Sequence, residues 1–171
     1  MLITFGGLPG TGKSTISKQV AQQLQAVYLR IDTVEQVLKR AIKHSNGVVG
    51  PEGYMVCNAV ALDNLRLGLT VIADSVNPIA ITRNDWQQIA IEANTNFIDI
   101  EIVCSNEKEH QHRIETRKAD IEGHSLPKWK DVLNRDYEPW KTKSITIDTS
   151  EHNIDESVLI ILDYIKNKSF E

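Results

Sequence analysis

The chain has 171 residues, 41% of them hydrophobic, and carries a formal net charge of −4 at pH 7. This length accommodates a substantial core, so we expect residues 1–171 to form a single domain. The acidic balance excludes a broadly basic platform for nucleic acid, although a local basic cleft is compatible with it. We therefore do not expect nucleic acid to be the partner, unless it binds locally.

Other features bear on location. The N-terminus lacks the basic segment and long apolar run of a signal peptide, and no apolar run reaches membrane-spanning length. Cys57 and Cys104 lie in apolar surroundings without C-x-x-C or zinc-binding spacing, which predicts buried reduced thiols. These features favour a cytoplasmic protein without a membrane partner. A monomer and a homodimer are both compatible with the sequence.

The N-terminal segment contains a complete G-x-x-x-x-G-K-[ST] motif. An apolar strand pattern at 2–5 precedes it, and apolar residues recur at helical spacing from 16 to 24, as this motif requires. Its glycines let backbone N–H groups approach a polyphosphate, its lysine reaches the β- and γ-phosphates, and its hydroxyl ligates Mg²⁺. The predicted nucleotide-binding residues are Gly7, Leu8, Pro9, Gly10, Thr11, Gly12, Lys13, Ser14 and Thr15. The motif therefore predicts that the chain binds a nucleoside triphosphate and Mg²⁺, with Lys13 taking part in catalysis.

Apolar segments rich in β-branched residues alternate with segments of helical period. The predicted strands cover residues 2–5, 26–29, 69–73, 97–103 and 144–147. Helices are predicted after the motif, at 34–42, at about 52–67, from 78 to 93, from about 107 and from about 153, with a break at 47–51. A polar stretch with Gly123 and Pro127 predicts a mobile lid at about 117–130. This α/β alternation predicts a parallel sheet covered on both faces, with ligands bound beyond the C-terminal strand ends.

Asp32 directly follows the second predicted strand, at the sheet edge where the phosphate-binding motif lies. In phosphoryl transfer, a carboxylate there can orient the attacking hydroxyl and accept its proton. Asp32 also has capping-box spacing with Glu35, so it could instead cap the second helix, and the two roles can coexist. We interpret Asp32 as a candidate catalytic residue that faces the acceptor.

Asp74 ends the third predicted strand in a Val-Ile-Ala-Asp run, which is typical of the aspartate that holds Mg²⁺ in nucleotide-binding proteins. A turn carboxylate is the alternative. Ser75 follows, whereas hydrolytic ATPases commonly have Glu at this place to polarise water, and the N-K-x-D element of guanine-specific proteins is absent. The sequence therefore favours an ATP-dependent kinase, with Ser14 and Asp74 as metal-binding residues.

Arg113 and Arg117 are four residues apart after the fourth strand, so we expect them on one helical face. One guanidinium could stack on adenine, and the other could stabilise the transferring phosphoryl group when the lid closes. We predict that Arg113 binds the nucleotide and that Arg117 takes part in catalysis. The alternative is that both lie on a solvated helix surface. Arg135 is a second candidate for the lid arginine, and a surface ion pair is its alternative.

The remaining polar and aromatic residues carry weaker indications. His110 and His112 are two residues apart and do not share a helical face, which argues against a metal pair. The three tryptophans, Trp86, Trp129 and Trp140, are expected to pack in the core or the lid rather than to stack on bases. Arg83 and the helix at about 52–67 are candidate contributors to an acceptor pocket.

In this order, the elements resemble the small P-loop kinases, a group that includes shikimate, gluconate and adenylylsulfate kinases, chloramphenicol phosphotransferase and polynucleotide kinases. The resemblance spans nearly the whole chain and is strongest at the phosphate loop. It implies a three-layer fold with five parallel strands in the order 2-3-1-4-5 and a short lid, with Asp32 facing the acceptor. Asp74 to Pro78, followed by Arg83 and Trp86, is similar to the polynucleotide-kinase branch. That branch usually shows Asp-x-Asn, whereas here one extra residue separates Asp74 from Asn77.

These observations predict an ATP- and Mg²⁺-dependent kinase that transfers the γ-phosphate to a hydroxyl of a small polar acceptor. A polynucleotide 5′-hydroxyl kinase is one alternative. A nucleotide-binding regulator without transfer activity is another.

Overall fold

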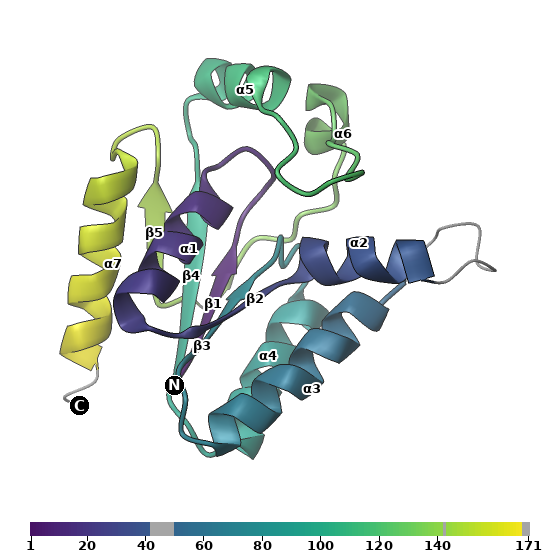
Figure 1. The fold of residues 1–171 in the computed structure, drawn as a ribbon. Coiled ribbons are helices and arrows are strands. Elements are labelled where there is room, and N and C mark those ends of the chain that lie inside the picture. Colours follow the sequence, from purple (N-terminus) through teal and green to yellow (C-terminus); the bar gives the residue numbers. More distant parts are fainter. Residues whose placement is uncertain (42–49, 142, 169–171) are drawn as a thin grey trace.

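The computed structural model describes residues 1–41, 50–141 and 143–168. Its centre is a sheet of five parallel strands in the order β2-β3-β1-β4-β5 (Figure 1). The strands are β1 (Leu2–Gly6), β2 (Val27–Arg30), β3 (Val71–Asp74), β4 (Phe97–Val103) and β5 (Ile145–Asp148). The strand order confirms the fold that the resemblance implied.

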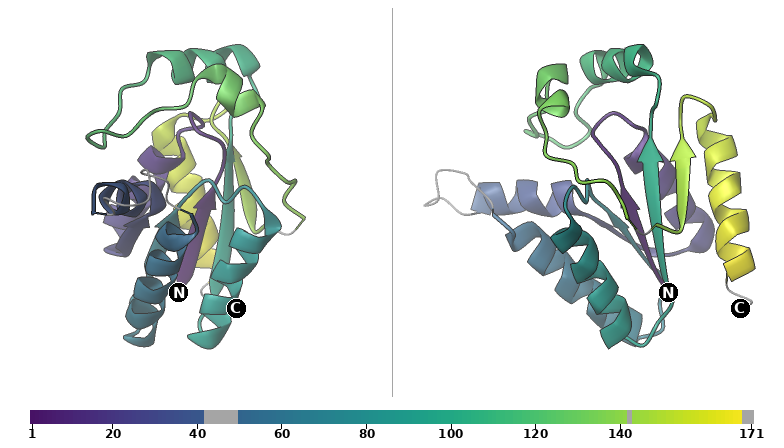
Figure 2. Two further views of the ribbon diagram at one scale, coloured as in Figure 1. Left: turned by 90° about the vertical axis from the view of Figure 1, so that its right-hand side faces the viewer. Right: turned by 180° about the vertical axis from the view of Figure 1, so that it is seen from behind.

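Helices cover both faces of this sheet (Figure 2). They are α1 (Lys13–Leu24), α2 (Ile31–Ala41), α3 (Glu52–Arg66), α4 (Ala80–Glu92), α5 (Glu107–Thr116), α6 (Trp129–Leu133) and α7 (Ile154–Lys168). α1 and α7 pack together on one face, α3 and α4 pack on the other, and α5 and α6 lie above the loop between β1 and α1 (Figure 1). Among the described helices, none combines the length and apolar character needed to span a bilayer.

One described helix, α6, is missing from the sequence prediction. It begins at the end of the predicted lid and has 5 residues, which are too few to show a helical period. Local contacts stabilise it: the Asp131 carboxylate accepts a hydrogen bond from the Lys128 backbone at 2.9 Å, and the Trp129 ring meets His110 edge-on at 5.2 Å. Residue 42 of the predicted second helix and residues 47–49 of the predicted break lie outside the described residues.

Two apolar clusters hold the layers together. One lies between the sheet and the α1–α7 pair and includes Phe5, Ile16 and Ile161, all fully buried. The other lies between the sheet and the α3–α4 pair and includes Cys57 and Trp86. Trp86 is therefore a core residue, as predicted. The two clusters fix the sheet between its helices and so fix the strand ends.

The C-terminal ends of the three strands on one side of the sheet come together. Register pairs Phe5 of β1 with Asp74 of β3, and pairs Asp74 with Arg30 of β2. The loop after β1, the start of α2 and the last residue of β3 therefore lie at one sheet edge. This edge is where the sequence predicted ligand binding.

A buried carboxylate lies in β4, away from that edge. Asp99 accepts hydrogen bonds from the Thr4 hydroxyl and, at 3.5 Å, from the Gln87 amide. Burial raises the pKa of Asp99 to about 6, although these bonds and the Arg83 guanidinium oppose the rise. Because this pKa lies above the unfolded value, protonation of Asp99 stabilises the fold at low pH, and that contribution is lost as the pH rises through about 6.

Asp99→Asn is expected to mimic the protonated carboxyl and to raise the free energy of unfolding by about 1–3 kcal/mol above pH 6. The gain should shrink as the pH falls toward about 4, where wild-type Asp99 is also protonated. Urea unfolding at several pH values measures it, with Asp63→Asn on the exposed face of α3 as the control. A gain that stays constant across this range would contradict the prediction.

Candidate active site

The loop between β1 and α1 has the conformation of an anion-binding loop. Gly10 and Gly12 adopt φ angles of 86° and 90°, which side chains disfavour. Gly12 is the N-cap of α1, and as a glycine it has no side chain to cap the first N–H groups of that helix. Those N–H groups and the positive end of the helix dipole therefore face the loop, which is the arrangement that binds phosphate.

Two residues outside the motif hold this loop in place. The Thr149 hydroxyl donates to the Thr11 carbonyl at 2.8 Å, from the turn after β5. His110 of α5 is buried and its Nε2 lies 2.8 Å from the Pro9 carbonyl oxygen. His110 is thus a loop contact, and the described part of the chain holds no cluster of three or more His, Cys, Asp or Glu residues that could bind a metal ion.

Lys13 and Asp74 form a buried ion pair at the sheet edge. Lys13 Nζ lies 2.5 Å from Asp74 Oδ1, and the Tyr28 hydroxyl donates to Asp74 Oδ2 at 2.6 Å. Burial by itself would raise the pKa of Asp74, but the Lys13 ammonium and hydrogen bonds from Lys13, Tyr28 and Ser14 hold it below its usual value. Asp74 is therefore an ionised carboxylate aimed at the loop, rather than a turn residue in solvent.

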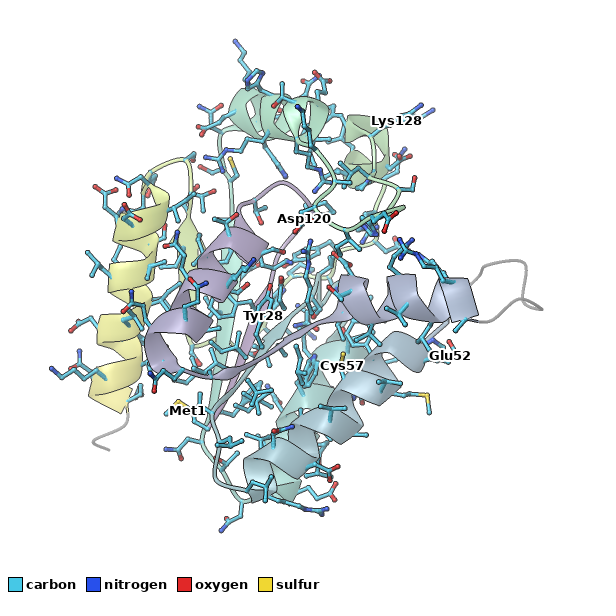
Figure 3. The ribbon with its side chains drawn as sticks, in the orientation of Figure 1. Met1, Tyr28, Glu52, Cys57, Asp120 and Lys128 are labelled. Carbon is cyan, nitrogen blue, oxygen red and sulfur yellow. The ribbon has the colours of Figure 1, made fainter. Side chains whose placement is uncertain are left out.

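Arg30 is a site residue that the sequence interpretation missed. Its guanidinium makes two hydrogen bonds with Asp120 of the predicted lid, at 2.5 and 3.1 Å. It also lies 3.8 Å from Asp74 and 3.9 Å from Asp32. Figure 3 shows Asp120 close to the N-terminal end of α2, so the segment after α5 contacts the sheet edge through this pair. Asp32 was selected because it follows the second predicted strand at the ligand-binding edge of the sheet, and Arg30 could have been selected for the same reason.

Asp32 lies in the first turn of α2, inside the helix rather than before it. Its side chain is 34% exposed and lines the same cleft as the phosphate loop. Within the described chain, its carboxylate accepts no hydrogen bond from a backbone N–H group, and its ion-pair partner is Arg30. The structure therefore does not support the capping alternative for Asp32.

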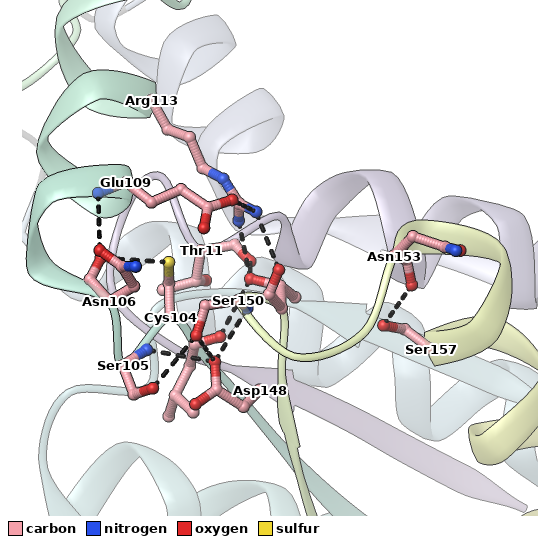
Figure 4. A network of polar contacts seen from close by, with 12 residues as sticks. Thr11, Cys104, Ser105, Asn106, Glu109, Arg113, Asp148, Ser150, Asn153 and Ser157 are labelled. Atoms are coloured by element: carbon pink, nitrogen blue, oxygen red, sulfur yellow. Dashed lines mark hydrogen bonds and ion pairs between the residues drawn. The ribbon is translucent and has the colours of Figure 1, made fainter.

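Arg113 is held by a polar network between α5 and the turn after β5 (Figure 4). It donates to the Thr149 hydroxyl at 2.7 Å, to the Thr149 carbonyl at 2.9 Å and to Glu109 at 2.5 Å. Since Thr149 also contacts Thr11, the network joins Arg113 to the phosphate loop. The alternative of a solvated surface residue does not hold for Arg113.

Arg117 does not share a helical face with Arg113, because α5 ends at Thr116 and the backbone of Arg117 is extended. The expectation of a common face is therefore wrong, yet both side chains line the same cleft. Burial lowers the pKa of Arg117; Asp32 and Asp120 oppose this effect, and Arg30 and Arg135 add to it. Among the described residues its buried Nε atom has no hydrogen-bond partner, so Arg117 has donor capacity left for a ligand.

Two cavities meet at the phosphate loop. A cleft of about 740 Å³ contains the loop, Asp32, Arg117 and Arg135, and a second cavity of about 620 Å³ lies between Gln19 of α1 and the turn after β5. Gly12 and Arg113 line both. The cavities are therefore adjacent and could hold two parts of one ligand.

Arg83 lies elsewhere. It is buried, with its guanidinium over the Trp140 ring at 5.0 Å and donating to the Glu138 carbonyl at 3.0 Å. Trp140 in turn packs on Gly6, where an added Cβ would lie 2.1 Å from the ring. Arg83 therefore anchors the chain after α6 and does not serve the acceptor pocket that the sequence suggested for it.

The fold and the phosphate loop define a small P-loop kinase. The chain belongs to a family described as an AAA domain, whose model matches residues 2–135. An adenylyl-sulfate kinase of Synechococcus sp. (strain JA-3-3Ab) is 24% identical over 174 residues, covering 98% of this chain and 95% of that protein. An L-seryl-tRNA(Sec) kinase of Methanococcus maripaludis is 27% identical over 187 residues, covering 100% of this chain and 68% of that protein.

A solved structure shares the fold. The Mycobacterium tuberculosis APS kinase CysC in complex with AMPPNP and APS superposes with a TM-score of 0.72 at 18% identity, covering 96% of each chain. At this identity the likeness establishes the architecture alone.

Lys13→Ala leaves the buried Asp74 carboxylate without its ammonium partner, and we expect it to lower the free energy of unfolding by about 2–4 kcal/mol. Adding Asp74→Asn removes the unpaired charge and should recover most of the loss. Urea unfolding of the single and double variants measures this coupling, with Lys18→Ala on the exposed face of α1 as the control. A double variant whose loss equals the sum of the single losses would show that the two side chains do not interact.

Proposed function

We propose that the chain is an ATP- and Mg²⁺-dependent phosphotransferase that moves the γ-phosphate of ATP to a hydroxyl of a small polar acceptor. The observation that carries this proposal is that the phosphate loop, Asp32 and Arg117 line one cleft of about 740 Å³. The named kinases among the relatives support it. The free thiols Cys57 and Cys104 are both buried, which supports a cytoplasmic location.

The two cavities suggest how the nucleotide lies. The adenine base would enter the cavity beside Gln19 and Arg113, and the triphosphate would cross Gly12 into the larger cleft. Residues Gly7 to Thr15 would hold the phosphates through backbone N–H groups and the Lys13 ammonium. Arg113, fixed by Thr149, would stack on the base or contact the phosphates from one side.

Ser14 and Asp74 fit a magnesium ion. Lys13 Nζ lies 3.5 Å from the Ser14 hydroxyl and 2.5 Å from Asp74, so both oxygens converge on one cationic group. Hydroxyl and carboxylate oxygens are ligands that Mg²⁺ prefers. When bound, the ion would neutralise charge on the phosphates.

In the transfer step, Asp32 would orient the acceptor hydroxyl and accept its proton as the hydroxyl oxygen bonds to the γ-phosphorus. The bond between that phosphorus and the β–γ bridging oxygen breaks, and ADP leaves. Lys13 and Arg117 would stabilise the negative charge on the transferring group and on ADP. The lid, tied to the sheet edge by Asp120 and Arg30, would keep water out of the cleft.

A kinase acting on an RNA-linked hydroxyl is the second candidate, since basic side chains gather in the cleft of an otherwise acidic protein. They are Lys13, Arg30, Lys39, Arg113, Arg117, Lys118 and Arg135. Transfer of labelled phosphate to an oligonucleotide, with binding that weakens steeply as salt rises, would favour this candidate. Transfer to small hydroxyl compounds with little salt dependence favours the main proposal.

Asp32→Asn is expected to reduce kcat by about 100- to 10,000-fold, because the amide cannot accept the hydroxyl proton. The thermal stabilisation given by AMPPNP should be unchanged, since Asp32 is not placed on the phosphates. Product formation from Mg·ATP and a panel of hydroxyl metabolites measures the effect, and Asp63→Asn is the control. A folded Asp32→Asn protein with full transfer activity would remove Asp32 from catalysis, and a protein without transfer activity in any form would favour a nucleotide-binding regulator.

Arg117→Ala is expected to lower kcat by about 1,000-fold while the KM for ATP changes only a few-fold, because charge on the transferring group develops in the transition state. Arg66→Ala, which breaks an exposed ion pair with Glu92, should leave both constants unchanged. Steady-state kinetics decide the point: equal kcat values for wild type and Arg117→Ala would exclude the role.

A further inference from the structure

We infer that Glu35 is a second carboxylate of the acceptor site, and that it selects an acceptor carrying a hydrogen-bond donor, hydroxyl or ammonium, one or two carbons from the hydroxyl that is phosphorylated. This inference rests on the proposed phosphotransferase function. It adds a specificity-determining residue and a class of acceptor: neutral or cationic polyols and amino alcohols, rather than acids or phosphate esters.

Glu35 lies three residues after Asp32 on α2, so the two carboxylates share one helical face, with Cβ atoms about 5–6 Å apart. Both line the cleft, together with Tyr54 of α3. An acceptor that presents one hydroxyl to Asp32 would therefore bring its neighbouring group to Glu35. The spacing suits groups on adjacent carbons or on carbons one further apart.

A glycine on the facing helix makes room for Glu35. A Cβ built on Gly53 of α3 would lie 2.5 Å from Glu35 Cγ. Gly53 is buried in the first turn of α3, where glycine is a poor helix former. Because Gly53 has no side chain, the Glu35 side chain can lie against α3, with Oε1 3.3 Å from the Cβ position, and still line the cleft.

The Glu35 carboxylate has no protein donor in the described chain: it makes no hydrogen bond and no ion pair there. Burial raises the pKa of Glu35, Asp32 raises it further, and Lys39 and Arg135 oppose the rise. Burial raises the pKa of nearby Tyr54 to about 12, so the phenol stays neutral. A half-buried carboxylate beside a second carboxylate needs donors to replace water, and an acceptor that supplies them is favoured.

The same chemistry rejects other acceptors. A carboxylate or phosphate at the neighbouring position of the acceptor would face both Asp32 and Glu35 at close range. An acceptor without a donor there would leave Glu35 desolvated and unpaired. Sites built to hydrogen-bond a substrate group discriminate strongly against analogues that lack it.

The test compares three probes on one two-carbon skeleton, 2-aminoethanol, ethane-1,2-diol and glycolate, each with Mg·ATP and wild-type protein, so that the group beside the reacting hydroxyl is an ammonium, a hydroxyl or a carboxylate. We expect kcat/KM for 2-aminoethanol and ethane-1,2-diol to exceed that for glycolate by about 10-fold or more. In Glu35→Gln the ratio of 2-aminoethanol to glycolate should fall by about 10-fold or more, because the amide keeps the shape and loses the charge. The KM for ATP should stay unchanged, and Glu107→Gln, which removes an exposed charge from α5, should leave the ratio at its wild-type value.

Gly53→Ala is the second variant, since it keeps both charges and displaces the Glu35 side chain. It should lower the same ratio without lowering the melting temperature, because alanine favours the helix. A purely structural role for Glu35 would change stability and leave the ratio unaltered.

Preference of the wild type for glycolate, or a ratio unchanged in Glu35→Gln, would overturn the inference and leave the proposed function standing. AMPPNP binding without transfer to any of the three probes would also overturn it. Absence of AMPPNP stabilisation in the wild type would remove the proposed function itself, and the inference with it.

Discussion

The ion pair between Lys13 and Asp74 is the constraint on which the site depends. It joins the loop after β1 to the last residue of β3, and Tyr28 binds the other carboxylate oxygen from β2. Three strand ends are thereby tied to one buried carboxylate. Because both charges are almost completely buried, neither can leave without a replacement partner, and phosphates and a metal ion offer those replacements.

Arg30 extends this tie to the segment after α5. Its guanidinium lies between Asp74, Asp32 and Asp120, so one cation connects the proposed metal ligand, the candidate base and the predicted lid. A change of charge at the phosphate loop would act on Asp74, then on Arg30, and then on the pair between Arg30 and Asp120. The contact of the predicted lid is thus electrostatically coupled to this sheet edge.

The fold could be read from the sequence because its signals are local. The phosphate loop needs particular residues in consecutive positions, and the strands are short apolar runs bounded by turns. Asp74 could also be predicted, since it ends such a run. The strand order came from the resemblance, and the structure confirms it.

Other site features depend on contacts between distant segments, and the sequence could not reveal them. Thr149 and His110 contact the phosphate loop, although each lies more than ninety residues after the loop in the sequence. Arg113 and Arg117 do not share a helical face because α5 ends before Arg117. Their spacing of four residues does not indicate where the helix ends. Arg30 could have been selected from its place at the end of a strand. Its structural role could not, because that role depends on its hydrogen bond with Asp120 of the predicted lid.

The two ends of the cleft differ in how far their side chains are buried. Lys13 and Asp74 are buried and joined by a short polar contact, so we expect this end to tolerate little change. Asp32 and Glu35 are only partly buried on one face of α2; among the described residues Glu35 has no protein donor, whereas Asp32 lies 3.9 Å from Arg30. Under the proposed function, substitution on that face would alter the choice of acceptor while leaving the ion pair and both apolar clusters intact. The specificity of this chain should therefore be sought in that turn of α2 and its neighbour α3.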